Sequence, residues 1–166
     1  MININLIRMG MQVTRWHTQP RVKEESVGHH TANFIAILLA VDPNCRKEVI
    51  VEAVYHDVAE FVTGDCPATV KHYDAKVGKA LDWLEDNFRE QSGITADLLT
   101  NSEKNLLHYC DRLESLLSAV EDMNKGNKYA EMIVNNAVEM LDGMNVTEEV
   151  RAAGKAMYKQ VKENQQ

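Results

Sequence analysis

The chain has 166 residues, 45% of them hydrophobic, which is long enough for one well-buried core and short for two domains. Its formal net charge of −7 argues against a general duplex nucleic-acid binder, because such proteins present a basic face to the phosphate backbone. The three cysteines include no C-x-x-C pair and therefore indicate neither a disulfide framework nor a thiolate zinc knuckle, so we expect a reducing, cytoplasmic setting.

The chain shows no sign of membrane insertion. It does not open with the basic and then apolar pattern of a signal peptide, and its longest apolar run, FIAILLAV at residues 34–41, is far shorter than a membrane span. We therefore expect a soluble protein with no membrane partner.

Apolar residues recur three and four positions apart along almost the whole chain, and no segment alternates convincingly with period two. This pattern predicts an all-α fold, a single compact bundle of about six to seven helices over residues 1–166. The expected helices span residues 2–13, 27–41, 46–62, 73–91, 102–125, 128–142 and 147–163.

Short polar segments with Gly or Pro separate these helices. Asp42-Pro43-Asn44 stops one helix and starts the next, and the run from Thr63 to Pro67 ends the helix before it. Ser102 and Glu103 are expected to begin the long fifth helix. The polar tail after about Lys159 is expected to fray.

Four side chains that can bind a metal fall inside the expected helices: His30, His56, Asp57 and Asp111. Each would carry a desolvation cost if it were buried alone, and one divalent cation bound by all four would remove that cost. The mixed nitrogen and oxygen set is compatible with manganese, cobalt, iron, zinc or magnesium, and the imidazoles favour a transition metal. The alternative is a structural helical bundle with scattered polar residues.

Two further acids follow the His56-Asp57 pair. Glu60 lies one helical turn after His56, so it can reach the open side of a metal without being a ligand. Asp65 follows Gly64 in the loop beyond. The ordered combination of a histidine, an HD pair, a second acid one turn later and a remote aspartate is hard to obtain by chance.

These motifs resemble the HD-domain metal-dependent phosphohydrolases, specifically the branch of small 5′-deoxynucleotidases and phage-type deoxynucleoside triphosphate hydrolases. The resemblance covers about residues 5–127, and the helices at residues 128–163 carry no diagnostic motif. The matching segments are Arg15-Trp16, SVGHH (26–30), YHDVAEFVTGDCPATVK (55–71) and YCDRLESL (109–116).

The resemblance implies an HD-domain fold and a role for each motif residue. It implies that the metal ligands are His30, His56, Asp57 and Asp111. It also implies that two acids, Glu60 and Asp65, serve the reaction and that two cations, Arg15 and Lys71, hold phosphate. The divalent ion is expected to be cobalt, manganese or zinc, with magnesium possible.

The side-chain chemistry agrees with these roles. A divalent cation makes water a better nucleophile near neutral pH, and an unligated Glu60 can orient that water or pass a proton to the leaving oxygen. Asp65 can point at a sugar hydroxyl or along the proton path, or it can simply cap its loop. Arg15 offers a planar fork for phosphate, and Lys71 a point charge.

The run RWHTQP at residues 15–20 is assigned to substrate binding through Trp16 and Thr18. Trp16 either stacks on a base or crowds the ribose 2′ position, which the resemblance links to a preference for deoxynucleotides. The alternative is a tryptophan that covers an edge of the core.

The sequence departs from the family pattern at two histidines. His29 stands where relatives usually have Glu, and it supports either a second metal or, as we favour, a different outer hydrogen bond. His108 stands where relatives often have Lys. We expect His108 to touch phosphate with a charge that depends on pH.

The substrate is expected to be a deoxynucleotide. RWHTQP is more similar to the phage-type enzymes, so we favour a dATP-type triphosphohydrolase that releases deoxynucleoside and triphosphate. A 5′-deoxynucleotidase acting on monophosphates is the alternative. A non-catalytic nucleotide sensor is a remoter one, because Glu60 and Asp65 are intact.

By resemblance we also expect a homo-oligomer, either a dimer or a larger ring. Apolar positions on the late helices can close the core or pair subunits, and methionine suits either use. These positions are Met123, Met132, Ile133 and Met140.

Overall fold

The computed structural model describes residues 3–67, 70, 73–94 and 99–164, and within them the chain is almost entirely helical, as predicted. The helices are α1 Ile4–Gly10, α2 Val27–Val41, α3 Lys47–Tyr55, α4 Glu60–Thr63, α6 Ala75–Gln91, α7 Asn101–Asn124, α8 Ala130–Gly143 and α9 Glu148–Glu163. Two short strands, β1 Thr14–Arg15 and β2 Glu25–Ser26, pair antiparallel. No helix in the described ranges is long and apolar enough to cross a membrane.

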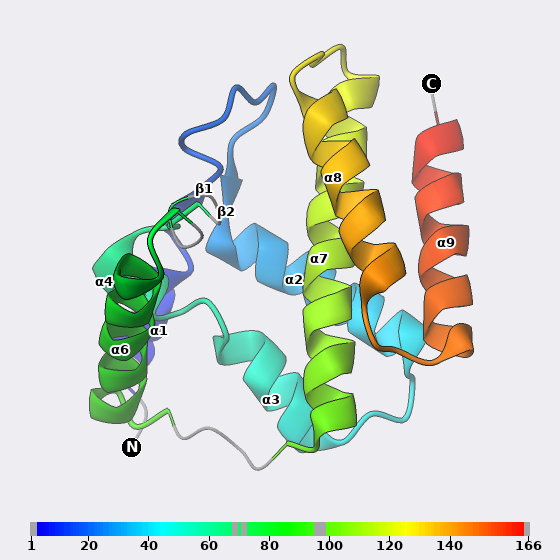
Figure 1. Cartoon of the computed structure of the whole chain (residues 1–166). Coiled ribbons are helices and arrows are strands. Elements are labelled where there is room, and N and C mark those ends of the chain that lie inside the picture. Colours follow the sequence, from blue (N-terminus) through cyan, green and yellow to red (C-terminus); the bar gives the residue numbers. More distant parts are fainter. Residues whose placement is uncertain (1–2, 68–69, 71–72, 95–98, 165–166) are drawn as a thin grey trace.

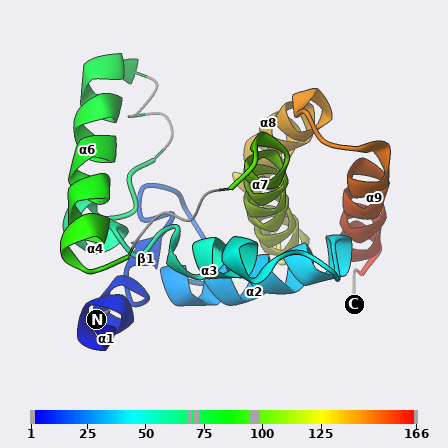
Figure 2. The same cartoon turned by 90° about the horizontal axis from the view of Figure 1, so that it is seen from below.

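The longest helix, α7, forms the centre of the main core. It packs against α8, α9, α2 and α3, and its buried apolar face includes Leu113, Leu116 and Val120. Figures 1 and 2 show α7, α8 and α9 on one side of the molecule, α1, α4 and α6 on the other, and α2 with α3 running between the two groups. The site described below lies where these groups meet.

Helix α7 begins one residue earlier than the sequence predicted because Thr100 caps it. The Thr100 hydroxyl accepts the backbone N–H of Glu103 at 3.2 Å, and the Glu103 carboxylate accepts the backbone N–H of Thr100 at 2.8 Å. This reciprocal capping box satisfies two N–H groups that a helix end leaves unpaired. At the other end of the chain, α9 continues through Lys159 to Glu163, so the expected fraying after Lys159 is not seen in the helix.

The strand pair places the segment around Arg15 beside the start of α2. Arg15 pairs with Glu25, and Ser26 both ends β2 and caps α2 by accepting the N–H of His29 at 3.2 Å. His30 therefore follows directly in the first turn of α2. Strands of two residues each are too short to show alternation, which is why the sequence did not indicate them.

The helix predicted at residues 46–62 is wrong as a single element, because it is divided into α3 and α4 by a turn at residues 56–59. The His56 ring donates from Nδ1 to the carbonyl of Ala53 at 2.8 Å. In a regular helix that carbonyl would accept the backbone N–H of Asp57. The side chain replaces the backbone donor, and the N–H of Glu60 bonds to the carbonyl of Asp57 with three-residue spacing, at 3.0 Å.

Helix α1 packs directly against this turn at Gly10. A Cβ atom built on Gly10 would lie 2.6 Å from the carbonyl oxygen of Val58, a contact with backbone that cannot easily move. Gly10 is therefore required by the close approach of α1 to the turn that carries His56 and Asp57.

We predict that Gly10→Ala lowers the free energy of unfolding by about 1–3 kcal/mol, the usual cost of overpacking. Urea denaturation followed by circular dichroism measures this change. Gly143→Ala is the matched control, since a Cβ at Gly143 meets nothing within 4 Å. Equal stability of the two variants would contradict the packing argument.

Candidate active site

The four predicted metal ligands come together from three parts of the fold. His30 belongs to α2, His56 and Asp57 to the turn after α3, and Asp111 to α7. The Nε2 atom of His30 lies 3.1 Å from Asp111 Oδ1 and 3.6 Å from Asp57 Oδ2, and the Nε2 atom of His56 lies 3.1 Å from Asp57 Oδ2. One ligand atom each of His30, His56 and Asp111 lie within 4.8 Å of one another.

Both imidazoles are held with Nε2 facing this common space. The Nδ1 of His56 donates to the carbonyl of Ala53, which can only accept, so Nε2 of His56 carries a lone pair. The Nδ1 of the fully buried His30 hydrogen-bonds to the Glu114 carboxylate, one turn after Asp111 on α7. The two Nε2 atoms are 3.3 Å apart, and when both rings are neutral their two lone pairs cannot bond to each other. A divalent cation accepting both lone pairs and both carboxylates fits this arrangement.

The charges around His30 also fit a cation. Burial opposes a charge on His30, but its hydrogen bonds to Asp111 and Glu114 outweigh burial and raise its pKa to about 9. Burial likewise opposes ionisation of Asp57, but the His56 charge outweighs it and Arg15 adds to the effect, so the pKa of Asp57 is lowered. The acids therefore stay ionised and draw positive charge into the cluster.

Arg15 contacts one of the four predicted ligands and also lines the neighbouring cavity. Its Nη1 donates to Asp57 Oδ2 at 3.1 Å and its Nη2 to the Ser115 hydroxyl at 3.5 Å, while its side chain is only 10% exposed. The guanidinium is thus fixed beside Asp57, a predicted metal ligand.

Trp16 has a backbone φ of 59°, which is uncommon for a residue other than glycine. Three contacts hold the residue in place. Its backbone N–H donates to Asp65 at 2.7 Å, and its ring N–H donates to Glu25 at 2.8 Å. The Arg21 guanidinium lies over the ring, 5.2 Å from its centroid. Asp65 therefore ties its loop to Trp16, a contact that the sequence did not predict.

A network of polar side chains next to Trp16 links β2 and the β1–β2 connection to α7. Sequence reasoning missed this network. Ser118 donates from its hydroxyl to Glu25 at 3.2 Å, and Arg21 donates to Ser118 at 2.9 Å and pairs with Asp122 at 3.3 Å. Glu25 and Asp122 are both buried. The available signal was Asp122, an acid inside an expected helix.

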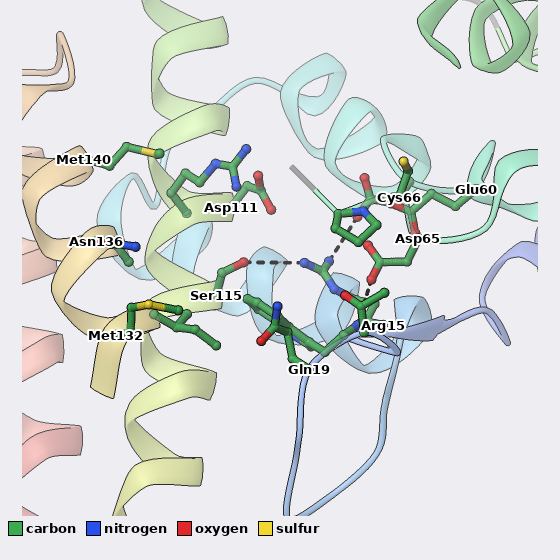
Figure 3. A pocket seen from close by; sticks show the side chains of 17 residues that line it. Arg15, Gln19, Glu60, Asp65, Cys66, Asp111, Ser115, Met132, Asn136 and Met140 are labelled. Atoms are coloured by element: carbon green, nitrogen blue, oxygen red, sulfur yellow. Dashed lines mark hydrogen bonds and ion pairs between the residues drawn. The ribbon is translucent and has the colours of Figure 1, made fainter. Parts of the chain in front are cut away.

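A cavity of about 390 Å³ adjoins the cluster (Figure 3). Of the predicted site residues, it is lined by Arg15, Trp16, Thr18, Asp57, Glu60, Asp65 and Asp111. The other lining residues are Gln19, Cys66, Pro67, Arg112, Ser115, Met132, Ile133, Asn136, Ala137 and Met140. Helix α8 thus supplies a whole wall that no motif had indicated.

Glu60 lines the cavity and has one carboxyl oxygen that the described part of the fold leaves unpaired. Its Oε2 is buried without a hydrogen-bond partner among the described residues. Burial is the main reason that its pKa rises to about 9, and the charges of Asp57 and Asp65 add to the effect. The carboxyl group therefore holds a proton at neutral pH when no cation is nearby.

Two of the expected positions, His29 and His108, belong neither to the group of four predicted ligands nor to the cavity lining. His108 is exposed on α7, and the cavity runs from Asp111 toward Ser115, in the opposite direction along the helix. His29 is exposed too. The Nδ1 of His30 hydrogen-bonds to Glu114, and not to His29. Lys71 lies outside the described residues.

Arg112 lines the cavity, whereas His108, four residues earlier on α7, does not. It lines the cavity one residue after Asp111 and forms no ion pair with any residue that the structure describes. Its guanidinium is therefore available to a bound anion.

Comparison with known proteins identifies the family. The family model described as "5'-deoxynucleotidase YfbR-like" matches residues 4–161, so the chain belongs to this family of HD-domain phosphohydrolases. Curated 5′-deoxynucleotidases that it resembles come from Pectobacterium atrosepticum, 25% identical over 138 residues (69% of each chain), and Vibrio vulnificus, 27% identical over 146 residues (74% of this chain and 75% of the other).

Two solved structures share the fold. One is the cyanophage S-2L HD phosphohydrolase DatZ bound to dA and one catalytic Zn²⁺, with a TM-score of 0.74, 16% identity and coverage of 99% of both chains. The other is the PH0347 protein from Pyrococcus horikoshii OT3, with a TM-score of 0.68, 18% identity and coverage of 94% of this chain and 96% of the other. The predicted HD-domain fold is confirmed.

We predict that Glu114→Gln weakens metal affinity about 10- to 100-fold although Glu114 is not a ligand, because the neutral amide no longer orients and polarises His30. Competition with a zinc-binding dye measures this affinity. Glu121→Gln, at an exposed position on the same helix, should leave it unchanged. Equal affinities in the two variants would show that the His30 to Glu114 contact does not support the metal.

Proposed function

We propose that the protein is a metal-dependent 5′-deoxynucleotidase, which hydrolyses a deoxynucleoside monophosphate to deoxynucleoside and inorganic phosphate. The observation that carries the proposal is the convergence of two imidazole lone pairs and two carboxylates at one end of the cavity, beside a fixed guanidinium. The names of the curated relatives support the monophosphate as substrate. A cavity of about 390 Å³ is at the small end of ligand pockets and suits a mononucleotide.

A divalent cation would be held by His30, His56, Asp57 and Asp111. When bound, it would neutralise charge on a phosphoryl oxygen and favour ionisation of water near neutral pH. Zinc is our first choice because the set contains two imidazoles and because the cyanophage structure contains a catalytic Zn²⁺. Cobalt and manganese remain alternatives, with magnesium less suited to imidazole.

The cationic side chains would bind the phosphate. Arg15 is oriented by Asp57 and Ser115, so its guanidinium can face the phosphoryl oxygens without losing side-chain freedom on binding. Arg112 offers a second guanidinium from α7. Lys71 keeps its predicted phosphate-binding role, and His108, exposed and outside the cavity lining, is the weaker candidate.

Glu60 is the proposed proton carrier. The attacking water forms a bond to phosphorus while the bond between phosphorus and O5′ breaks, and the leaving oxygen needs a proton. The protonated Glu60 carboxyl can supply it, and a proton from the attacking water can restore the acid. One Glu60 carboxyl oxygen is unpaired among the described residues and the residue lines the cavity, so the group is free to exchange a proton with a bound substrate.

Trp16 and Asp65 would position the sugar. Because the Trp16 ring is fixed by Glu25 and Arg21, it forms a rigid wall of the cavity that can disfavour a ribose 2′ hydroxyl. Asp65 holds the Trp16 backbone and lines the same cavity, so a contact with the sugar remains compatible with its position. Thr18 lies on the same wall.

Triphosphate hydrolysis, which the sequence favoured, is the second candidate function. Two guanidiniums line the cavity, Arg15 and Arg112, and a triphosphate would offer them more oxygens to bind than a monophosphate does. A sensor without turnover is less compatible with the buried, unpaired Glu60 oxygen. Assembly into a homo-oligomer and a cytoplasmic location stay predictions.

The phosphate number can be determined with one substrate panel. We predict that dAMP releases inorganic phosphate with zinc, cobalt or manganese, that chelation abolishes this release, and that AMP reacts more slowly because of its 2′ hydroxyl. Chromatography of the products from dAMP, dATP, AMP and ATP measures all three effects. Release of triphosphate from dATP without any hydrolysis of dAMP would instead establish the second candidate.

The division of roles between ligand and proton carrier gives a second prediction. Asp57→Ala should lose both bound metal and activity, whereas Glu60→Gln should keep the metal and lose about 10²- to 10⁴-fold in rate. Metal analysis of each purified protein is compared with its rate of phosphate release. Equal loss of metal in both variants would show that Glu60 is a ligand.

A further inference from the structure

We propose that the α8 wall of the cavity binds the nucleobase and that the side-chain amide of Asn136 reads its edge, an inference that rests on the proposed function. The metal cluster and Arg15 fix the phosphate at one end of the cavity. Figure 3 shows Asn136, Met132 and Met140 projecting from α8 on the side opposite Glu60 and Asp65. A nucleotide bound through its phosphate therefore extends its base toward α8.

The α8 wall has the surface that a flat aromatic ring requires. Met132, Asn136 and Met140 are spaced four residues apart and share one face of the helix, and Ile133 and Ala137 line the cavity between them. Met132 is 65% exposed and Met140 46% exposed, so this apolar surface stays in water unless something covers it. Methionine side chains adapt to aromatic rings and make favourable sulfur contacts with them.

Asn136 provides the one polar group in the middle of this stripe. It lines the cavity and is exposed to solvent, and its amide has no hydrogen-bond partner among the residues that the structure describes, so it is free to bind a ligand. A side-chain amide offers a donor and an acceptor side by side, which matches N7 and the N6 amino group of adenine. The corresponding edge of guanine presents two acceptors and cannot pair with both groups.

Gln19 adds a second amide from the connection between β1 and β2. Its side chain lines the cavity and has no polar partner in the described part of the chain. Two unpaired amides on different elements of one cavity favour a ligand with several hydrogen-bonding edges, as a base has, over a simple phosphate ester.

The test compares Asn136→Ala with Asn135→Ala, an adjacent exposed asparagine that does not line the cavity. Calorimetry of the metal-loaded proteins measures the affinity for deoxyadenosine, which has no phosphate. Asn136→Ala should weaken it at least about fivefold, and Asn136→Asp, which keeps the size but loses the N–H donor, should weaken it too. Asn135→Ala should bind as the unchanged protein does.

Kinetics provide the second readout. Asn136→Ala should raise the KM for dAMP and leave the rate on 2-deoxyribose 5-phosphate, a substrate without a base, unchanged. Equal losses on both substrates, or the same deoxyadenosine affinity in the two alanine variants, would overturn the proposal. So would a changed subunit number in Asn136→Ala with unaltered deoxyadenosine binding, which would make α8 a subunit contact.

The two proposals can fail separately. If the unchanged protein hydrolyses no deoxynucleotide but binds deoxyadenosine through Asn136, the base site stands and the nucleotidase proposal fails. If it releases phosphate equally well from dAMP and 2-deoxyribose 5-phosphate and binds no deoxyadenosine, the nucleotidase chemistry stands and the base site fails.

Discussion

Two imidazole nitrogens that face each other at 3.3 Å impose the main constraint on this structure. Each ring has already donated its only other N–H, His30 to Glu114 and His56 to the Ala53 carbonyl, so neither nitrogen can donate to the other in the neutral form. The carboxylates of Asp57 and Asp111 lie next to these two nitrogens. Such a cluster is stable only with added positive charge, supplied by a proton on His30 or by a metal ion. Metal binding and protonation at this point are therefore competing events.

The surrounding fold serves to hold these groups in place. The large hydrophobic core fixes α7 against α2, and with them Asp111 against His30. The turn that carries His56 and Asp57 is not part of a regular helix, and it is supported from outside by α1 through the contact of Gly10 with Val58. A defect in α1 can therefore reach the metal cluster without touching a ligand, because the turn has few alternative backbone hydrogen bonds.

The sequence identified four side chains that the fold brings together, His30, His56, Asp57 and Asp111, because residue types able to bind a metal can be recognised in the sequence and their order resembles a known family. It could not predict the turn at residues 56–59, since apolar spacing continues through it and a side-chain hydrogen bond makes the break. Nor did it indicate Arg112, which lies four residues after His108 on α7. Its place on the cavity lining depends on α8, which closes the cavity toward Ser115, and packing of remote helices is not encoded in a local motif.

The polar groups left without partners carry the strongest information about the ligand. Proteins pair nearly all of their buried polar groups, so an unpaired one marks a place where something else binds. Among the described residues that line this cavity, the buried atoms without a hydrogen-bond partner are a carboxyl oxygen of Glu60 and the Nε of Arg15. Arg112 and Asn136 also line it, and their side chains are exposed to solvent. A proton carrier, guanidiniums and an amide on one cavity are the groups that the proposed nucleotide would use.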